Sequence, residues 1–298
     1  MPVLQPSKIA YLGPAGTYSE AAAETYAKGN HPQNHQIQLC PYPSIFQTLQ
    51  AVALGEVDIG VVPVENSIQG SVTMTLDGLW LLEQLQIQQA LVLPIAHVFI
   101  SQAKQLSDIK TVYSHPQALA QCQQWLEQHL SNIQLIPTNS TTEALQHLTS
   151  ETSAGAISSE RAAQLYQLPI LANKISDYPE NCTRFWVVSL CASPGGNHTS
   201  LAFSVPANIP GTLVKPLQIF ATRNINLSRI ESRPTKRSLG DYVFFIDIEA
   251  NTTDSAVQSA LVELKSHTET IKVFGSYDIA LHLSSVAVGI AGTGNSRL

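Results

Sequence analysis

Charged residues are scarce in this chain: they make up 13% of its 298 residues, against about 25% in an average soluble protein. The 16 Lys and Arg residues are outnumbered by 22 Asp and Glu residues, which leaves a net charge of −6 at pH 7. A nucleic-acid-binding surface requires a basic stripe, so this composition argues against nucleic acid as a partner. Before residue 199 the only arginines are Arg161 and Arg184. An anionic ligand bound there must be held largely by backbone N–H groups, hydroxyls and amides.

Long hydrophobic runs and cysteine pairs are also missing. No window reaches 18 consecutive apolar residues, so we expect no membrane-spanning segment. The first twelve residues lack both the basic start and the apolar stretch of an export signal. The cysteines form no C-x-x-C pair and are expected to be buried free thiols; they are Cys40, Cys122, Cys182 and Cys191. We therefore expect a cytoplasmic protein without a metal or other cofactor.

Strand patterns alternate with helix patterns over the first 190 residues. Strands are predicted at residues 8–12, 57–62, 91–100, 111–113, 134–136, 154–157 and 184–190. Helices are predicted at residues 19–28, 44–54, 76–85, 117–129, 141–148 and 160–166. Pro94 indicates an edge or a bend in its strand. This alternation predicts an α/β fold built from parallel βαβ units.

The pattern changes after a Gly- and Pro-containing linker at residues 193–199. The predicted order then becomes strand, helix, strand, strand, helix, strand, over residues 201–205, 212–222, 227–230, 242–248, 255–266 and 271–275. This order is the ferredoxin-like βαββαβ arrangement. A domain of this size would gain from pairing its sheet with a second copy of itself.

Four polar turns are predicted at junctions between strands and helices. The first, Gly13 to Ser19, lacks the spacing of a P-loop or a Rossmann fingerprint. It could present N–H groups to an anion, or it could cap the helix through Thr17 and Glu20, and both can hold at once. The second turn places Glu65, Asn66 and Ser67 after a buried strand, where open α/β sheets bind ligands. An ordinary polar loop is the alternative.

The third turn begins with Ser114, a natural N-cap before Pro116. Gln117 and Gln121 lie four residues apart and should share a helix face. His115 could act as a base or could be an exposed residue of the cap.

The fourth turn, Asn181 to Phe185, contains Arg184, which could clamp a carboxylate through two hydrogen bonds or could lie on the surface. Together the four turns predict a ligand-binding cleft between two α/β lobes.

These motifs, in this order and spacing, resemble the prephenate dehydratase family. The residues that carry the resemblance are GPAGTYS at 13–19, VPVENS at 62–67, SHPQ at 114–117 and TRF at 183–185. The C-terminal part is similar to that family's ACT domain, through PGTL at 210–213, NLSRIESRP at 226–234 and YVFFID at 242–247. One departure is Thr212, where the family commonly has a small apolar residue. No chorismate mutase-like segment precedes residue 8, so the similarity is to the monofunctional form.

The resemblance implies a two-lobed catalytic domain with the fold of type II periplasmic binding proteins. It would span residues 8–192, with lobe one at about 8–85 and 178–192 and lobe two at about 86–177. A linker at 193–199, an ACT regulatory domain at 200–280 and a tail at 281–298 would follow.

The activity implied is the decarboxylating dehydration of prephenate to phenylpyruvate in phenylalanine biosynthesis, with no cofactor. Thr183 would donate a hydrogen bond to the departing hydroxyl, and Arg184 with the first turn would neutralise a carboxylate. The implied catalytic residues are Thr183, Arg184, Glu65 and Asn66. The implied substrate-binding residues are Gly16, Thr17, Ser19, Ser67, Ser114, Gln117, Gln121 and Phe185.

The resemblance also implies a homodimer or homotetramer that is inhibited by L-phenylalanine at an interface between ACT domains. The effector-binding residues would be Gly211, Thr212, Leu213, Val214, Asn226, Leu227, Glu231 and Ser232. Two alternatives remain at this point: an arogenate dehydratase, and a non-catalytic sensor with the same fold.

Overall fold

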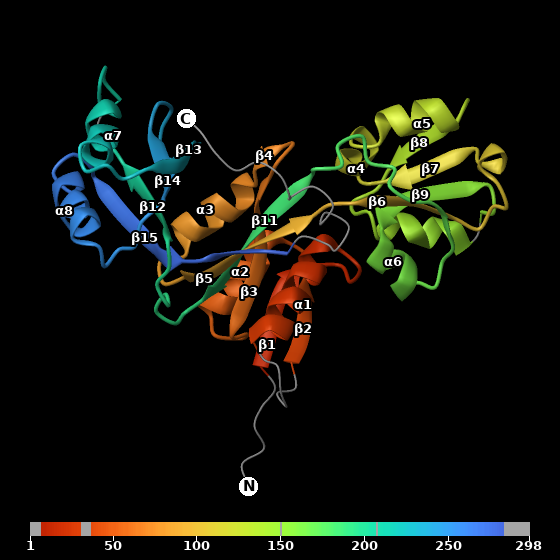
Figure 1. Cartoon of the computed structure of the whole chain (residues 1–298), viewed down its shortest axis with the longest axis horizontal. Helices are drawn as coiled ribbons and strands as arrows, with labels where there is room; N and C mark the ends of the chain where they lie inside the picture. Colours follow the sequence, from red (N-terminus) through yellow and green to blue (C-terminus); the bar gives the residue numbers. More distant parts are fainter. Residues whose placement is uncertain (1–6, 31–36, 150, 207, 283–298) are drawn as a thin grey trace, which may run out of the picture.

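The computed structural model describes residues 7–30, 37–149, 151–206 and 208–282. They form three units, each built on its own β-sheet (Figure 1). The first lobe lies in the middle, and the second lobe and the C-terminal domain lie at opposite ends of the molecule. In the part of the chain that is described, no helix combines the length and the apolar content needed to cross a bilayer.

The first lobe contains a seven-stranded sheet in the order β16-β5-β11-β3-β1-β2, with β4 beside β3. Helix α1 (Tyr18–Asn30) covers one face, and α2 (Ile45–Ala53) and α3 (Thr73–Leu81) cover the other. The strands are β1 (Ser7–Leu12), β2 (Ile37–Tyr42), β3 (Ile59–Asn66), β4 (Gly70–Ser71), β5 (Gln86–Pro94), β11 (Cys182–Ser189) and β16 (Ile279–Leu281). The central strands are buried on both faces, which explains their nearly continuous apolar sequences.

The second lobe contains a five-stranded sheet in the order β10-β6-β9-β7-β8. Its strands are β6 (His97–Ser101), β7 (Thr111–Ser114), β8 (Gln134–Pro137), β9 (Ala154–Ser159) and β10 (Ile170–Ala172). Its helices are α4 (Pro116–Ala120), α5 (Gln123–His129) and α6 (Glu160–Leu165), with 3₁₀ turns at Leu106–Asp108 and Glu143–Thr149. The N-terminus of α5 is capped by Asp177, whose carboxylate accepts the N–H groups of Gln124 and Trp125.

The chain crosses between the lobes about ten residues later than the expected boundary at 85/86. Residues 91–100 were predicted as one strand, but they belong to β5 and β6, which lie in different sheets. The break follows Pro94, which has no N–H to continue a ladder. Strand β5 therefore belongs to the first lobe, where it pairs with β11.

Other predicted elements also differ from the structure. Residues 117–129 form two helices, because the chain turns at Gln121 and Cys122, and residues 143–149 form a 3₁₀ helix rather than an α-helix. Strand β2 was not predicted. All four cysteines are free, as expected, but only Cys122 is buried; Cys40 and Cys182 are half-buried, and Cys191 is exposed.

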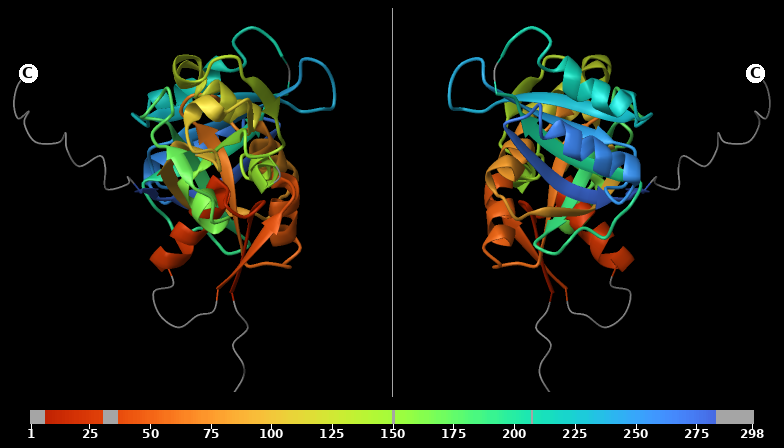
Figure 2. Two further views of the ribbon diagram at one scale, coloured as in Figure 1. Left: turned by 90° about the vertical axis from the view of Figure 1, so that its right-hand side faces the viewer. Right: turned by 90° about the vertical axis from the view of Figure 1, so that its left-hand side faces the viewer.

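The C-terminal domain has the predicted βαββαβ order. Its sheet, β13-β14-β12-β15, comprises β12 (His198–Ser204), β13 (Leu227–Pro234), β14 (Tyr242–Ile248) and β15 (Thr270–Tyr277). Helices α7 (Val214–Ala221) and α8 (Ser255–Leu264) pack on its outer face, which is turned toward the viewer in the right-hand view of Figure 2.

The inner face of this sheet shares one hydrophobic core with the first lobe. Phe245 stacks on Phe274, with ring centroids 6.0 Å apart, and meets Trp80 of α3 edge-on at 6.4 Å. Trp186 of β11 donates its indole N–H to the hydroxyl of Tyr277 at 3.2 Å. The domain is therefore packed against the first lobe rather than merely linked to it.

The end of the described chain returns to the first lobe. Strand β16 pairs in parallel with β5, so the expected domain end at residue 280 falls inside a strand of the first sheet. Of the predicted tail, residues 283–298 lie outside the described residues.

Lys272 of β15 caps α3 from the C-terminal domain. Its Nζ donates to the carbonyls of Leu79 and Leu82 at 2.5 and 2.6 Å, at the helix end where a cation is favourable. Burial lowers the pKa of Lys272 from 10.5 to about 8, although Glu83 opposes the shift. A neutral amine still has two N–H groups for the two carbonyls.

We predict that Lys272 makes the protein more stable as the pH rises from about 8 to 10.5. In this window the unfolded chain holds a proton that the folded chain has released, so the free energy of unfolding increases with pH. Urea unfolding of the wild type and of Lys272→Met at several pH values measures this: the difference should grow in favour of the wild type. The same change at Lys215, an exposed lysine of α7, should give a difference that does not vary with pH. A flat difference for Lys272 would contradict the prediction.

Candidate active site

The candidate site lies where the two crossings between the lobes run side by side. The N–H of Ile95 on the outgoing crossing donates to the carbonyl of Asn181 on the returning one, at 2.8 Å. The N–H of His97 donates to the hydroxyl of Ser176 at 3.0 Å. The crossings are thus bonded to each other, and side chains from both lobes meet at them. We call this region the hinge site: His97, Gln121, Asn181, Asn66 and Thr183.

A β-bulge aligns the polar end of β3 with the start of β11. Arg184 of β11 pairs with Glu65 of β3, and the next residue, Phe185, pairs with Pro63. Val64 is therefore an extra residue of β3 that has no partner on β11. An extra residue reverses the face to which the following side chains point. Asn66 consequently lies directly opposite Thr183 and on the same face.

The carboxamide of Asn66 joins these strands to the crossing. Its Oδ1 accepts the backbone N–H groups of Ile68 and Gln69, both at 3.1 Å. Its Nδ2 donates to Asn181 Oδ1 at 2.8 Å and to Thr183 Oγ1 at 3.0 Å. Thr183 is only 8% exposed. Because its oxygen accepts this bond, the hydroxyl keeps its own proton to donate.

The network continues into the second lobe. Asn181 Nδ2 donates to Gln121 Oε1 at 3.1 Å, and His97 Nε2 lies 2.9 Å from the same oxygen. Gln121 follows α4 directly, so its position depends on the second lobe. The ring of Tyr18 meets the ring of His97 edge-on at 5.9 Å, from α1 of the first lobe. Every residue of the hinge site is buried.

Burial also decides the charge of the network. It lowers the pKa of His97 below its ordinary value of 6.5, although the hydrogen bond with Gln121 opposes the shift. Burial raises the pKa of Tyr18 far above its ordinary value. The hinge site is therefore a neutral assembly of amides, one imidazole and one hydroxyl.

Arg184 lies on the opposite face of β11 from Thr183, because neighbouring side chains of a strand alternate. Its guanidinium is 3.5 Å from Glu65 and 3.4 Å from Asp247 of β14. Asp247 also holds Arg229 of β13 at 3.2 Å. The structure therefore brings Asn66 to Thr183, whereas it pairs Arg184 with Glu65 of its own lobe and with Asp247 of the C-terminal domain.

The first predicted turn packs against the second lobe. Gly16 has a φ of +86°, its carbonyl accepts from Ser159 Oγ at 2.9 Å, and its N–H donates to Glu20 at 2.7 Å. Thr17 Oγ1 accepts the N–H of Glu20 at 3.3 Å, and Arg161 pairs with the same glutamate at 3.0 Å. The turn is thus capped by its own glutamate, as the capping interpretation expects.

The remaining predicted site residues differ in their distance from the hinge site. Ser67 joins it, because its hydroxyl accepts from the N–H of Cys182 at 3.0 Å and donates to Asn181 at 3.4 Å. Gln117 lies in the first turn of α4, one turn before Gln121. Ser19 is buried in the first turn of α1, and Phe185 is buried in the core beneath that helix.

Ser114 is not the N-cap of α4. It ends β7, is fully buried, and donates to the carbonyl of Ile157 in β9 at 2.6 Å. The cap is His115, whose Nδ1 accepts the N–H of Gln117 at 3.2 Å. Ser114 thus holds the sheet together beneath the site.

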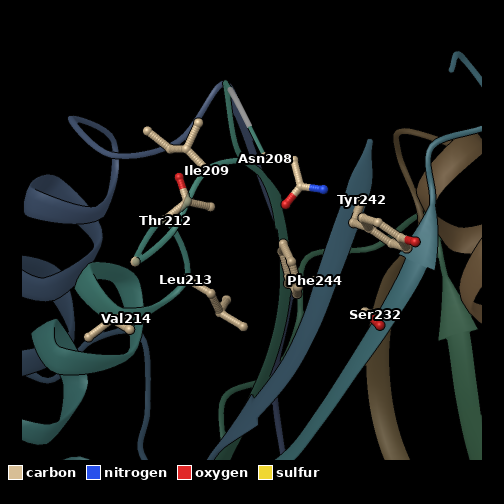
Figure 3. Close-up of a pocket in the computed structure, with 9 residues that line it drawn as sticks. Asn208, Ile209, Thr212, Leu213, Val214, Ser232, Tyr242 and Phe244 are labelled. Atoms are coloured by element: carbon tan, nitrogen blue, oxygen red, sulfur yellow. The ribbon is translucent and has the colours of Figure 1, made fainter. Parts of the chain in front are cut away.

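A pocket of about 340 Å³ lies in the C-terminal domain. Figure 3 shows that the segment before α7 faces β13 and β14 across it. Its lining residues are Asn208, Ile209, Gly211, Thr212, Leu213, Val214, Ser232, Tyr242 and Phe244. Five of the eight expected effector residues line it.

The other three expected effector residues lie elsewhere in this chain. Glu231 accepts a hydrogen bond from Ser71 of the first lobe at 3.1 Å. Asn226 is exposed, and Leu227 packs in the core of the C-terminal domain.

Several residues of the two sites were missed from the sequence. His97 gave no signal, because a single histidine in an apolar strand has no motif. Asn181 lies at the start of the fourth predicted turn, but no role was assigned to it. Tyr242 and Phe244 alternate along β14 and could have been assigned to one face of it. Among the described residues no three His, Cys, Asp or Glu side chains are grouped so that they could hold a metal ion.

Comparison with known proteins places most of the chain in two known families of domains. A model of the prephenate dehydratase family matches residues 9–192, and a model of the ACT domain matches residues 199–266. The chain is 40% identical over 277 residues to the bifunctional chorismate mutase/prephenate dehydratase of Aquifex aeolicus, covering 92% of this chain and 74% of that protein. It is 34% identical over 280 residues to a prephenate dehydratase of Lactococcus lactis subsp. cremoris, covering 91% and 98%.

Solved structures are similar over the same length. A prephenate dehydratase from Arthrobacter aurescens in complex with L-Phe has a TM-score of 0.80 at 35% identity, covering 91% of this chain and 90% of that one. A protein called GqqA, described as a novel type of quorum quenching acylase, has a TM-score of 0.79 at 26% identity, covering 92% and 98%.

We predict that Gly16→Ala weakens substrate binding by separating the lobes. A Cβ at this position would lie 3.2 Å from the Cβ and 3.3 Å from the Cα of Ala162. Gly55→Ala is the matched control, because Gly55 also has a positive φ, +71°, but nothing lies within 4 Å of its added Cβ. Both changes should lower the free energy of unfolding by about 1–2 kcal/mol.

Only Gly16→Ala should also raise the Michaelis constant, by about tenfold. Urea unfolding and steady-state kinetics of the two variants provide the measurement. Equal Michaelis constants would show that the contact between Gly16 and α6 does not set the closed arrangement of the lobes.

Proposed function

The chain belongs to the prephenate dehydratase family and carries that family's ACT domain, and we propose how its residues carry out and regulate the reaction. Prephenate loses its ring hydroxyl and a carboxylate as carbon dioxide, and phenylpyruvate forms. Because the ring becomes aromatic, the protein mainly has to orient the substrate and assist the departing hydroxyl. One observation carries the proposal: Thr183, buried at the hinge, accepts a hydrogen bond from Asn66 and keeps its own proton.

Thr183 would donate this proton in a hydrogen bond to the oxygen that leaves. The Asn66 amide fixes the direction of the donation, because it occupies a lone pair of the threonine oxygen. A threonine hydroxyl is too weak an acid to release its proton fully. We therefore assign it the role of stabilising charge on the departing oxygen and of passing on a proton that solvent replaces, so that the oxygen leaves as water.

The substrate dianion would be held mainly by neutral donors. Arg184 lies on the other face of β11, paired with Glu65 and Asp247, so we assign it to docking of the ACT domain on the catalytic strand. Ser67 and the amide of Gln121 remain on the face that carries Thr183. Several oriented donors can replace one point charge in a site shielded from water.

Acyl transfer, the activity described for GqqA, finds less support in this site. A threonine nucleophile needs an adjacent base to take its proton. The side chain bonded to Thr183 is the amide of Asn66, which cannot act as one, and the imidazole of His97 is bonded to Gln121 instead. Incubation with prephenate and with an N-acyl amide distinguishes the two activities, and we expect turnover of prephenate alone.

Phenylalanine is the effector that the pocket of the C-terminal domain fits. Leu213, Val214 and Phe244 offer an apolar surface for the ring, and the turn before α7 offers N–H groups for a carboxylate. The related Arthrobacter structure was solved with L-Phe. Gly211 has a φ of +84° and open space at its Cβ position, so its backbone conformation rather than crowding requires glycine.

Strand β13 connects this pocket to the catalytic lobe. Its side chains alternate, so Ser232 lines the pocket while its neighbours Glu231 and Arg233 point to the first lobe. Arg233 forms two hydrogen bonds with Asp77 of α3, at 3.0 and 3.1 Å. Glu231 accepts from Ser71 of β4.

Strand β4 in turn pairs with β3 at Glu65 and Asn66. A shift of β13 on binding phenylalanine would therefore reach the partner of Thr183 through two strands. Such a shift inhibits only if phenylalanine binds the active and inactive arrangements unequally.

A second copy of the chain would complete the effector site. Asn226 and Leu227 lie outside the pocket of their own chain, and β13 is an edge strand whose Ile230 is 46% exposed. We propose a homodimer, or a homotetramer built from it, that buries this edge. We also propose that the protein acts in the cytoplasm, as a biosynthetic enzyme.

We predict that Thr183→Val lowers kcat by about 10²-fold or more, because the donor to the leaving oxygen is lost. KM should change by less than about threefold, since valine has the shape of threonine. Thr183→Ser is the matched control and should keep most of the turnover. Steady-state kinetics on prephenate measure both. A folded valine variant with more than half of the wild-type kcat would remove Thr183 from the mechanism.

We predict that Asp77→Asn weakens inhibition by phenylalanine and leaves the uninhibited rate unchanged. Although burial opposes it, the hydrogen bonds from Arg233 and Lys236 hold the pKa of Asp77 below its ordinary value, so the pair is ionic. Its loss should raise the concentration for half inhibition by about tenfold, a usual size for allosteric coupling. Glu263→Gln breaks a similar pair with Arg223 between α7 and α8, and should leave inhibition unchanged. Equal sensitivity of the two variants would exclude the route through β13.

A further inference from the structure

The hydrogen bonds of the hinge site run in one direction, which the backbone sets. The N–H groups of Ile68 and Gln69 can only donate, so Asn66 Oδ1 accepts and Asn66 Nδ2 donates. Asn66 Nδ2 faces Asn181 Oδ1, which leaves Asn181 Nδ2 as the donor to Gln121 Oε1. The orientation of three carboxamides thus follows from two peptide groups at the end of β3.

The same logic fixes the proton on His97. Gln121 Oε1 can only accept, and His97 Nε2 lies 2.9 Å from it, so this nitrogen carries the imidazole proton. His97 Nδ1 is then unprotonated, and it lies 3.5 Å from the hydroxyl of Tyr18. That hydroxyl gives its one proton to the carbonyl of Ala96 at 2.7 Å and has none left for Nδ1, so the hydrogen bond that orients the ring is the one to Gln121.

One donor of the network has no partner. Gln121 Nε2 is fully buried and makes no hydrogen bond in the structure, although Gln121 as a whole is 3% exposed. A buried amide without an acceptor is strongly unfavourable. Prephenate offers carboxylate, keto and hydroxyl oxygens, all of which accept hydrogen bonds.

We propose that His97 is a positioning residue that holds the Gln121 amide with its NH₂ group toward an oxygen of the bound substrate. The inference rests on the proposed function of the hinge site. A glutamine amide can turn over with little change of shape, which exchanges its donor for its acceptor. The Nε2–H of His97 and the Nδ2–H of Asn181 prevent this, because both require an oxygen between them.

The position of His97 also makes the orientation depend on the lobes. His97 begins β6 of the second lobe, and Asn181 precedes β11 of the first. Gln121 Oε1 receives both donors only while the two crossings lie together. The substrate-binding donor is therefore assembled by the same contacts that hold the lobes in place.

Substitutions at position 97 separate this role from a purely structural one. In His97→Leu the donor is lost, and we expect KM for prephenate to rise about tenfold, with kcat changed by less than about threefold. In His97→Gln the side-chain amide can place an N–H near the position of Nε2, and we expect KM within about threefold of the wild type. Melting temperatures of both variants show whether the fold is intact. A glutamine variant with wild-type melting and the same KM as the leucine variant would overturn the proposal.

Gln121→Glu isolates the free donor. A carboxylate still accepts from His97 and Asn181, but it presents an anionic oxygen to the substrate in place of NH₂. We expect KM to rise more than tenfold, and we expect no further rise when His97→Leu is added, because nothing remains to be oriented. An equal effect of His97→Leu in both backgrounds would show that His97 does not act through Gln121.

The tautomer can be measured directly in the unsubstituted protein. Nitrogen-15 NMR should show a protonated Nε2 and an unprotonated Nδ1 for His97, assigned among the nine histidines by the signals lost in His97→Gln. A proton on Nδ1 would overturn the proposal even if the leucine variant fails to fold. If the wild type does not convert prephenate, the proposed function fails instead, and the tautomer still tests the network.

Discussion

A buried amide has to be satisfied at both its oxygen and its nitrogen, and this requirement organises the region where the two lobes meet. Asn66, Asn181 and Gln121 stand in line there, and each pairs its donor side with the acceptor side of the next. Exchanging the oxygen and the NH₂ group of any one of these amides would place two donors or two acceptors against each other. The line begins at two backbone N–H groups, so its direction does not depend on any ligand. The polar end of β3, the first residues of β11 and the end of α4 are held at fixed distances as a result.

The two faces of strand β11 make different contacts. The face with Thr183 belongs to the hinge, and the face with Arg184 and Trp186 belongs to the contact with the C-terminal domain. Side chains on both faces of a strand are attached to the same backbone. A displacement of the strand from one face therefore also moves the side chains on the other face. Strand β11 would thus let a domain placed at the opposite end of the molecule from the second lobe (Figure 1) influence the reaction that we propose for the hinge site. The bulge at Val64 serves the same end, because it turns Asn66 to the face of Thr183.

Much of the fold could be predicted from periodicity, and much of the site could not. The amphipathic α2 and the βαββαβ order of the C-terminal domain followed from the spacing of apolar residues. Pro94 marked a bend, but the sequence alone could not show that β5 and β6 lie in different sheets. The bulge at Val64 has no sequence signal, since it arises only when β3 is laid against β11.

The roles of individual residues were harder still. The motif at 183–185 placed Thr183 and Arg184 side by side, whereas strand geometry sends them to opposite faces. One partner of Arg184 is Asp247, 63 residues further along the chain, and no local pattern links the two. His97 was overlooked because its role depends on its contact with Gln121, which only the folded structure shows.

Strand β16 adds one further property to the architecture. The C-terminal domain leaves the first sheet at the end of β11 and comes back to it at β16, beside β5. In the topology of the chain it is therefore an insertion between two strands of one sheet and not an appendage. A module attached at both ends is restrained at two points, so it would rotate mainly about the line through its two attachments. A module on a single linker can move in any direction. Rotation about that one line would be the movement that the two attachments oppose least, and a single axis of motion suits a switch with two positions.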